Sequence, residues 1–188
     1  MSKTITSFTQ KIELLATKLN IIYNFAQKYY LNVIRYEIVL GEITEKDHIL
    51  CIGGGFCPFS AILFHQMTGA KVTIIDYNTE CVHKAQKFIE KKGLSDYIKL
   101  YCRNGCCPEL DFNEYTIIHL ALQVAPLNEV LDEMKKRILS GTKILIRRPK
   151  EILNKLYCHF TIETFGCSSC IEHNKACNIG STYLYLKE

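Results

Sequence analysis

The stretch Ile49-Leu50-Cys51-Ile52-Gly53-Gly54-Gly55 decides the fold class, because it joins a short apolar run to three consecutive glycines. A second apolar run, over residues 72–75, ends at Asp76, about 20 residues further on, as in nucleotide-binding units. A glycine turn lets backbone amides approach a ligand closely, and a carboxylate after the second strand can accept hydrogens from both ribose hydroxyls. The stretch therefore predicts a nucleotide site on a Rossmann-like α/β domain.

Outside this unit, short apolar runs alternate with segments whose apolar residues recur at helical spacing. This alternation predicts a mostly parallel sheet covered by helices on both faces. Asn32 and Gly41 are candidate helix ends, and Thr79 is a candidate helix cap. The expected helices cover residues 7–43, 58–67, 79–92 and 126–139, and the further strands cover residues 98–102, 115–122 and 142–146.

The end of the chain follows a different pattern. Residues 157–164 and 182–186 have strand character and are separated by a polar, cysteine-bearing loop. They predict an antiparallel hairpin at the sheet edge, and a parallel sheet ending in such a hairpin is typical of the class I methyltransferase fold. We expect a single domain overall, in which residues 1–46 form an N-terminal helical segment packed on the core and residues 47–188 form the Rossmann-like domain that binds the nucleotide cofactor.

The composition limits the partners and the compartment. The 188 residues fit one domain, and the net charge of +4 is spread along the chain without a basic run, so we expect no nucleic-acid partner. No apolar stretch reaches the roughly 20 residues that span a bilayer, and the polar N-terminus lacks a secretory signal. We therefore expect a cytoplasmic protein without a membrane partner, whose ten cysteines are mostly reduced.

The glycine turn also indicates which nucleotide binds. A dinucleotide site uses G-x-G-x-x-G, whose last glycine allows close packing of helix on strand. Gly53 and Gly55 fit this pattern, but Pro58 takes the last position. This departure argues against NAD and not against S-adenosylmethionine, which has no pyrophosphate to seat. The alternative is that the glycines make only a tight turn and Asp76 caps the next segment.

Further cofactor contacts are expected where other strands end, because ligands of open α/β sheets bind there. Tyr77 lies next to Asp76. Asn104 follows the third strand and could bond the adenine amino group, although an Asn in a turn is an equal alternative. Gln123 follows the fourth strand and could face the ligand tail, or lie at the surface. With Gly53, Gly54, Gly55 and Asp76, these residues form the expected cofactor site.

The turn also resembles a known family. The stretch Cys51-Ile52-Gly53-Gly54-Gly55-Phe56-Cys57-Pro58-Phe59-Ser60 is similar to the Ile-Gly-Ser-Gly-Pro-Leu-Pro-Leu-Thr turn of nicotianamine synthases. Upstream, Tyr29-Tyr30-Leu31-Asn32 followed by Tyr36-Glu37 resembles the Tyr-Tyr-x-Asn-Tyr segment of that family and its nearby Glu. The resemblance covers roughly residues 29–148 and includes the second and fifth strands.

The resemblance implies a reaction and an acceptor site. The family condenses aminocarboxypropyl groups taken from S-adenosylmethionine rather than moving the methyl group, and it places Glu37 at the acceptor end. This chain departs from the family in its shorter length, in Phe56 and Cys57, and in the compressed spacing between Tyr30 and Glu37. We therefore expect a transferase that moves an aminocarboxypropyl or a methyl group to a small-molecule acceptor.

An amine acceptor must lose a proton before it attacks, and a nearby carboxylate can take it. Glu37 is the expected proton acceptor, with Tyr30 as a second catalytic residue. The alternatives are a solvent-facing Glu37 and a tyrosine that only packs.

The cysteines of the C-terminal region suggest a further site. The C-x-x-C pair formed by Cys167 and Cys170, together with neighbouring cysteines, could hold zinc or iron, which bind thiolate ligands. The alternative is a reduced, cysteine-rich loop. A metal site would fit an alternative function, that of a small metal-binding or redox-sensing protein that kept the nucleotide-binding fold without catalysis. The sequence is also compatible with a homodimer. The expected ligands are Cys158, Cys167, Cys170 and Cys177.

Overall fold

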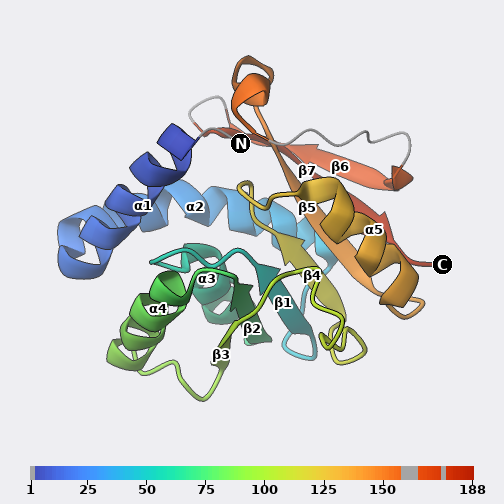
Figure 1. Cartoon of the computed structure of the whole chain (residues 1–188), viewed down its shortest axis with the longest axis horizontal. Helices are drawn as coiled ribbons and strands as arrows, with labels where there is room; N and C mark the ends of the chain where they lie inside the picture. The colour runs from blue at the N-terminus through green and yellow to red at the C-terminus, as the bar shows by residue number, and fades with distance from the viewer. Residues whose placement is uncertain (1–2, 158–164, 175–176) are drawn as a thin grey trace.

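A computed structural model describes residues 3–157, 165–174 and 177–188, and it shows a seven-stranded sheet with the strand order β3-β2-β1-β4-β5-β7-β6 (Figure 1). Strands β3, β2, β1, β4 and β5 are parallel, and β7 runs antiparallel to both β5 and β6. This confirms the expected mostly parallel sheet with an antiparallel C-terminal end. The strands are β1 (His48–Ile52), β2 (Lys71–Asp76), β3 (Ile98–Cys102), β4 (Ile117–Leu120), β5 (Lys143–Pro149), β6 (Ser169–Glu172) and β7 (Ile179–Leu186).

Strand β1 lies at the centre of the parallel part, with β2 on one side and β4 on the other. Its residues from Ile49 to Ile52 are buried, which explains a continuous apolar run rather than an alternating one. The pairing sets Ile52 beside Ile75 and Leu120. The turns that follow β1, β2 and β4 therefore open at the same edge of the sheet.

Two helices precede the sheet, α1 (Lys3–Lys18) and α2 (Asn20–Gly41). The expected helical region breaks at Leu19, which has an extended backbone. Asn32, a candidate end, lies inside α2, while Gly41 is the last residue of that helix. An asparagine is tolerated there because its side chain is exposed and the penalty for Asn within a helix is small.

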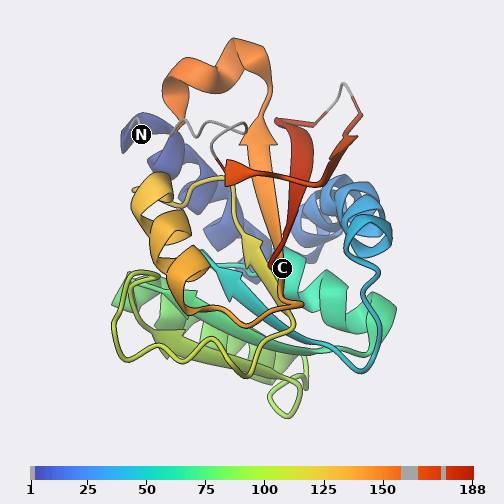
Figure 2. The same cartoon turned by 90° about the vertical axis from the view of Figure 1, so that its right-hand side faces the viewer.

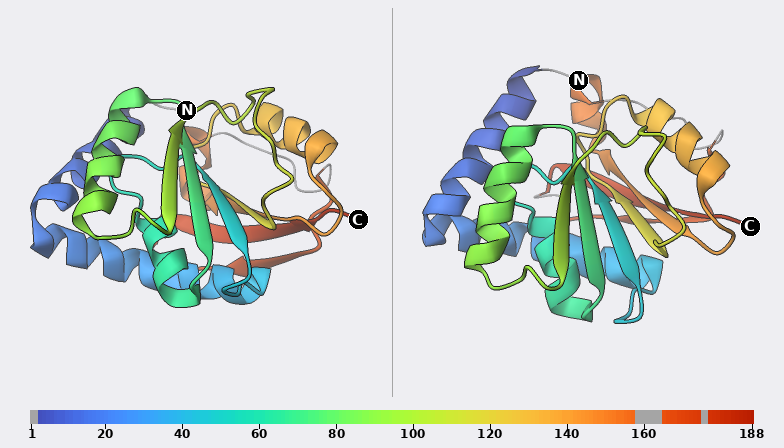
Figure 3. Two further views of the ribbon diagram at one scale, coloured as in Figure 1. Left: turned by 90° about the horizontal axis from the view of Figure 1, so that it is seen from below. Right: turned by 60° about the horizontal axis from the view of Figure 1, so that its bottom comes forward.

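Helices cover both faces of the sheet, as expected (Figure 3). One core cluster joins α2, α3 (Phe59–Thr68) and α4 (Thr79–Lys91) to one face, and a second joins α5 (Leu127–Arg137) to the other. Asn78, rather than the expected Thr79, caps α4, since its side chain accepts the backbone N–H groups of Glu80 and Cys81. Asn is among the best capping residues, so the cap lies one residue earlier.

The C-terminal hairpin is formed by different segments than expected. After β5, a 3-10 helix η1 (Glu151–Leu156) leads away from the sheet, and β6 pairs with β7 at the edge (Figure 2). Strand β6 comes from the segment expected to be a polar loop. Of the strand expected over residues 157–164, Tyr157 follows η1 and residues 158–164 lie outside the described residues. Strand β7 contains the expected 182–186 and begins three residues earlier.

None of the helices in the described part of the chain is both long and apolar enough to cross a membrane.

Candidate functional site

A cavity of about 370 Å³ opens where strands β1, β2 and β4 end, a size within the range of small-molecule sites. Its position agrees with the rule that open α/β sheets bind ligands beyond the carboxyl ends of their strands. Helices α1 and α2 supply its remaining wall. All seven expected cofactor residues line this cavity, namely Gly53, Gly54, Gly55, Asp76, Tyr77, Asn104 and Gln123.

The glycine turn forms the floor of the cavity. Gly53 and Gly55 have φ values of 87° and 62°, in the left-handed region that favours glycine. A Cβ atom on Gly54 would lie 2.5 Å from the Ile74 side chain, so this position also requires glycine. The three glycines thus bring bare backbone to the cavity, which is what close approach of a ligand needs.

Asp76 ends β2 beside this turn. Its Oδ2 accepts the Gly55 N–H at 3.0 Å, and its Oδ1 accepts the Asn78 N–H at 2.9 Å. An ionised carboxylate offers about four acceptor positions, so both oxygens retain capacity for ribose hydroxyls. Asp76 therefore holds the turn and keeps acceptor positions at the cavity.

The remaining expected contacts lie on the turns after β2, β3 and β4. Tyr77 is 75% exposed at the cavity rim, where its ring is free to cover a ligand. The Asn104 Oδ1 accepts the Cys106 N–H at 3.0 Å, so the asparagine shapes its own turn and retains an acceptor lone pair and its amide hydrogens. Gln123 is half-buried at the cavity wall.

Glu13 of α1 reaches the same turn, and sequence reasoning missed it. Its Oε2 accepts the Phe56 N–H at 2.9 Å, and its carboxyl oxygens lie where a side chain on Gly55 would be. Burial, together with the nearby Asp76, raises the pKa of Glu13 to about 7 in spite of its backbone hydrogen bonds. The one available signal was an acidic residue between Ile12 and Leu14 in an apolar stretch.

Tyr30 of α2 lines the cavity next to Glu13. Its ring stacks on Phe59 with centroids 5.4 Å apart and an interplanar angle of 15°. Burial raises its pKa, the Glu13 carboxyl raises it further, and Arg147 opposes this shift. The phenol therefore stays protonated near neutral pH.

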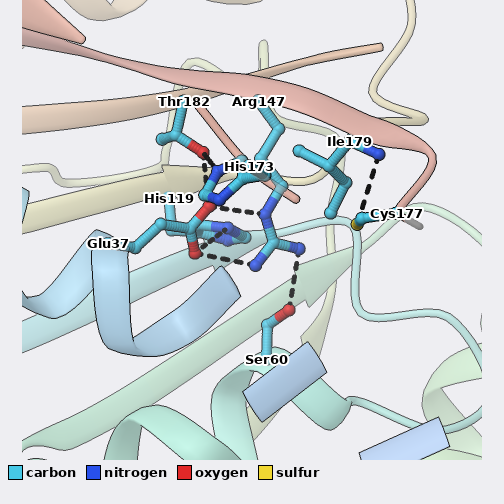
Figure 4. A network of polar contacts seen from close by, with 8 residues as sticks. All are labelled: Glu37, Ser60, His119, Arg147, His173, Cys177, Ile179 and Thr182. Carbon is cyan, nitrogen blue, oxygen red and sulfur yellow. Dashed lines mark hydrogen bonds and ion pairs between the residues drawn. The ribbon is translucent and has the colours of Figure 1, made fainter. Parts of the chain in front are cut away.

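Behind the cavity wall, Glu37 of α2 lies in a buried polar network (Figure 4). Its two carboxylate oxygens accept Nε–H and NH2 hydrogens of Arg147, each at 2.7 Å. Thr182 of β7 donates a third hydrogen bond of 2.7 Å to Glu37. Arg147 also donates to the Ser60 Oγ at 2.9 Å. The network thus ties α2 to α3, β5 and β7.

Two histidines complete this network. His173 Nε2 lies 2.7 Å from the Thr182 Oγ1, and because that hydroxyl donates to Glu37, the imidazole must donate to it. His119 Nε2 lies 3.6 Å from a Glu37 oxygen, and burial together with Arg147 lowers its pKa to about 3. Among the described residues, His119 Nε2 and His173 Nδ1 are buried without a hydrogen-bond partner. Burial lowers the pKa of both His119 and His173, so both rings are neutral near pH 7.

This geometry does not fit the role of proton acceptor expected for Glu37. Burial acts to raise its pKa, but the Arg147 charge and the hydrogen bonds from Arg147 and Thr182 outweigh that effect and hold the pKa below its ordinary value. Glu37 is also absent from the residues that line the cavity. Nor is it solvent-facing, since its exposed fraction is zero. It positions Arg147, which lines the cavity together with Ser60 and His119.

The expected metal ligands are only partly described. Cys177 is buried beside Val33 and Ile179, whereas Cys167 packs against the α5 side of the core. Cys170 is exposed on β6, and Cys158 lies outside the described residues. Within the described part of the chain, no group of three or more His, Cys, Asp or Glu side chains is placed to hold a metal. The four-cysteine set therefore stays a prediction.

The arrangement defines a class of protein. A bare glycine turn, an acidic residue at the end of the second strand and a cavity at the sheet edge are the features of a Rossmann-like, S-adenosylmethionine-dependent transferase. The family comparison is more specific, since the profile described as "Nicotianamine synthase protein" matches residues 2–174. The chain therefore belongs to the nicotianamine synthase family.

Solved structures agree with this fold assignment. A mutant of MtNAS in complex with S-adenosylmethionine is similar with a TM-score of 0.85 and 17% identity, over 99% of this chain and 76% of that chain. MtNAS in complex with MTA and tNA gives a TM-score of 0.80 and 16% identity, over 95% and 70%. An RNA methyltransferase from Salinibacter ruber in complex with S-adenosyl-L-homocysteine gives 0.65 and 17%, over 82% and 89%. At such identities the likeness establishes the fold.

No curated protein matches the sequence. Membership of the nicotianamine synthase family makes the chain an S-adenosylmethionine-dependent transferase. It does not favour the alternative of a metal-binding or redox-sensing protein without catalysis.

Proposed function

We propose that this protein transfers the aminocarboxypropyl group of S-adenosylmethionine to the amine of a small-molecule acceptor. The observation that carries the proposal is Glu13, a carboxyl group with a pKa of about 7 that lines the cavity beside the glycine turn. A catalytic base works best when its pKa lies near the working pH. The proposal thus moves the role of proton acceptor from Glu37 to Glu13.

The residues of the cavity fit the cofactor. The ribose belongs on Asp76, whose oxygens retain acceptor capacity beyond the Gly55 and Asn78 N–H groups. The amino-acid tail belongs near the turn at Gly53–Gly55, where the glycines line the cavity with bare backbone. Tyr77, Asn104 and Gln123 line the part of the cavity that would receive the adenine and the tail.

Bound S-adenosylmethionine supplies a carbon activated by its sulfonium, so that forming the new C–N bond breaks a C–S bond and leaves a neutral thioether. An acceptor amine is protonated near neutral pH, and its proton must leave before attack. Glu13 is placed to hold the ammonium and then to take that proton. Tyr30 lines the cavity together with Glu13 and Arg147 and would orient the acceptor with its hydroxyl. Residues of α1 and α2 form the wall at this end of the cavity.

Aminocarboxypropyl transfer is favoured over methyl transfer by the residues that carry the family resemblance. Glu37, Ser60 and Arg147 join in one hydrogen-bonded network, and the Arg147 guanidinium lies 5.8 Å from the centroid of the Tyr30 ring. Glu37 thus holds, from behind the cavity wall, an arginine that lines the cavity together with Ser60 and Tyr30. The family match over residues 2–174 supports the same reaction.

Mass spectrometry of the by-product tests this proposal. Protein incubated with S-adenosylmethionine and candidate amines should release methylthioadenosine, the thioether that remains after aminocarboxypropyl transfer. S-adenosylhomocysteine as the by-product would show methyl transfer instead and would contradict the proposal. Omission of the acceptor and a boiled sample provide the controls for spontaneous breakdown.

A further inference from the structure

Two carboxyl groups share one turn of the cavity. The Gly55 N–H bonds to Asp76 and the next amide, Phe56 N–H, bonds to Glu13, at 3.0 and 2.9 Å. The two side chains come from opposite sides, since Glu13 belongs to α1 and Asp76 ends β2. The turn therefore holds two acidic groups over its bare backbone.

Glu13 and Asp76 both act on the titratable groups around the turn. Burial raises the pKa of the Cys81 thiol to about 12, and both Asp76 and Glu13 contribute to that shift. Burial raises the pKa of Tyr30 as well, with Glu13 adding to it. The charge of Glu13 is thus felt on the α4 side and on the α2 side of the turn.

No cationic side chain of the described residues forms an ion pair with Glu13 or Asp76. The nearest basic groups are engaged elsewhere. Lys84 pairs with Glu80 at 2.6 Å and lies 4.6 Å from the centroid of the Phe56 ring, Lys92 lies 3.9 Å from the centroid of the Tyr23 ring, and Arg147 pairs with Glu37.

We infer that Glu13 and Asp76 together select the cationic sulfonium form of the cofactor over its neutral thioether counterparts. This inference rests on the proposed function and adds a specificity-determining role to Glu13. A cation in the cavity compensates the charges of both carboxyls, whereas a thioether brings no charge and leaves Glu13 to keep its proton up to about neutral pH. The same pair then favours departure of the thioether once the group has been transferred.

The physical consequence is a proton linkage. In the free protein, Glu13 is largely protonated below its pKa of about 7 and ionised above it. An opposite charge within about 4–6 Å lowers a carboxyl pKa by about 1–3 units, so a cationic ligand binds the ionised form better. Affinity for the sulfonium must therefore rise with pH, and affinity for a thioether must not.

Isothermal titration calorimetry between pH 5.5 and 7.5 tests this inference on the intact chain. The probes are S-adenosylmethionine and S-adenosylhomocysteine, which share the adenosine and the amino-acid tail and differ in the methyl group and charge at sulfur. We expect the affinity for S-adenosylmethionine to rise about tenfold or more over this range, and that for S-adenosylhomocysteine to change by less than about threefold. His119, in the same cavity, stays neutral throughout because its pKa is lowered to about 3.

Glu13→Gln gives the matched variant, because it mimics the protonated carboxyl that the fold already accommodates. The pH dependence for S-adenosylmethionine should vanish, and its preference over S-adenosylhomocysteine should fall about tenfold. Glu90→Gln on exposed α4 surface should behave as the parent.

Other outcomes overturn the inference. Equal pH dependence for both ligands would mean that the pair senses the tail ammonium and not the sulfonium. A preference unchanged in Glu13→Gln contradicts the role of Glu13. Failure of the parent protein to bind either ligand would contradict the proposed function itself, and so the two failures are distinguishable.

Discussion

The Glu37 carboxylate receives two 2.7 Å hydrogen bonds from the Arg147 guanidinium, and this buried pair joins α2 to β5 behind the cavity. Such paired, charge-assisted bonds fix the orientation of both groups. Because neither side chain has more than 3% of its surface exposed, each charge depends on the other for compensation. The pair therefore sets the position of the Arg147 edge that lines the cavity.

We predict that Glu37→Gln destabilises the protein. The variant leaves the Arg147 charge buried without its partner, and breaking a buried pair in this way costs about 3–5 kcal/mol. Thermal or urea unfolding at pH 7 measures the change. The double variant Glu37→Leu/Arg147→Met should lose less stability than the sum of the losses in Glu37→Leu and in Arg147→Met. A Glu37→Gln protein as stable as the parent would show that the pair is not formed in solution.

The same pair predicts an acid dependence of stability. The folded-state pKa of Glu37 lies below its ordinary value, and an unfolded Glu has a pKa of about 4.3. The stabilisation is thus fully present above about pH 4.3 and is lost as pH falls through the folded pKa. The difference in unfolding free energy between parent and Glu37→Gln should therefore shrink towards pH 3. A difference that is constant from pH 7 to pH 3 would contradict this ionisation state.

Asp76→Ala should weaken S-adenosylmethionine binding. Each charge-assisted hydrogen bond to ribose contributes about 1.5–3 kcal/mol, so the loss of one or more should reduce affinity at least about tenfold. Calorimetry measures the affinity, and circular dichroism checks that the turn at Gly55 survives. Asp111→Asn, which changes an exposed loop carboxylate, is the control. Unchanged affinity in Asp76→Ala would show that the ribose binds elsewhere.

Tyr30→Phe should slow turnover about tenfold or more, because Tyr30 lines the cavity with Glu13 and Arg147 and its hydroxyl would orient the acceptor. Stability should change little, since the stacking on Phe59 is kept. Tyr23→Phe is a close match, because Tyr23 also stacks on Phe59 at 5.4 Å and is not among the residues lining the cavity. Equal turnover in the two variants would make Tyr30 a packing residue.

The predicted cysteine ligands can be tested by metal analysis of the purified protein. Cys167 and Cys177 lie in different clusters, so we expect chelation to leave the melting temperature unchanged. Near-stoichiometric zinc or iron, with a lower melting temperature after chelation, would instead establish the set Cys158, Cys167, Cys170 and Cys177.

The sequence predicted those parts of the fold and site that depend on local spacing. Gly53, Gly55 and Asp76 follow two buried strands at fixed distances, so their meeting at one edge followed from parallel pairing alone. The strand at residues 169–172 was missed because its burial pattern is mostly exposed, which removes the apolar alternation that predicts a strand.

The partners of the acidic residues could not be predicted in this way. Glu13 meets the glycine turn only because α1 folds back onto it, and Glu37 meets Arg147 through packing of α2 on the sheet. Helical periodicity assigns a face to each helix but does not say which loop that face covers. Two signals in the sequence were not used. Arg147 and His119 are charged or polar residues within apolar strands, and such residues indicate a buried polar partner.

The pH dependence of methylthioadenosine formation in single turnover tests the central claim most directly, with parent and Glu13→Gln compared at saturating S-adenosylmethionine. In the parent, the rate should rise with pH through the pKa of the proton acceptor in the bound state. In Glu13→Gln, it should be lower by about 10²–10⁴ and lack that titration, since the base is gone. A Glu13→Gln protein that releases methylthioadenosine at the parent rate and with the parent pH profile would contradict the account.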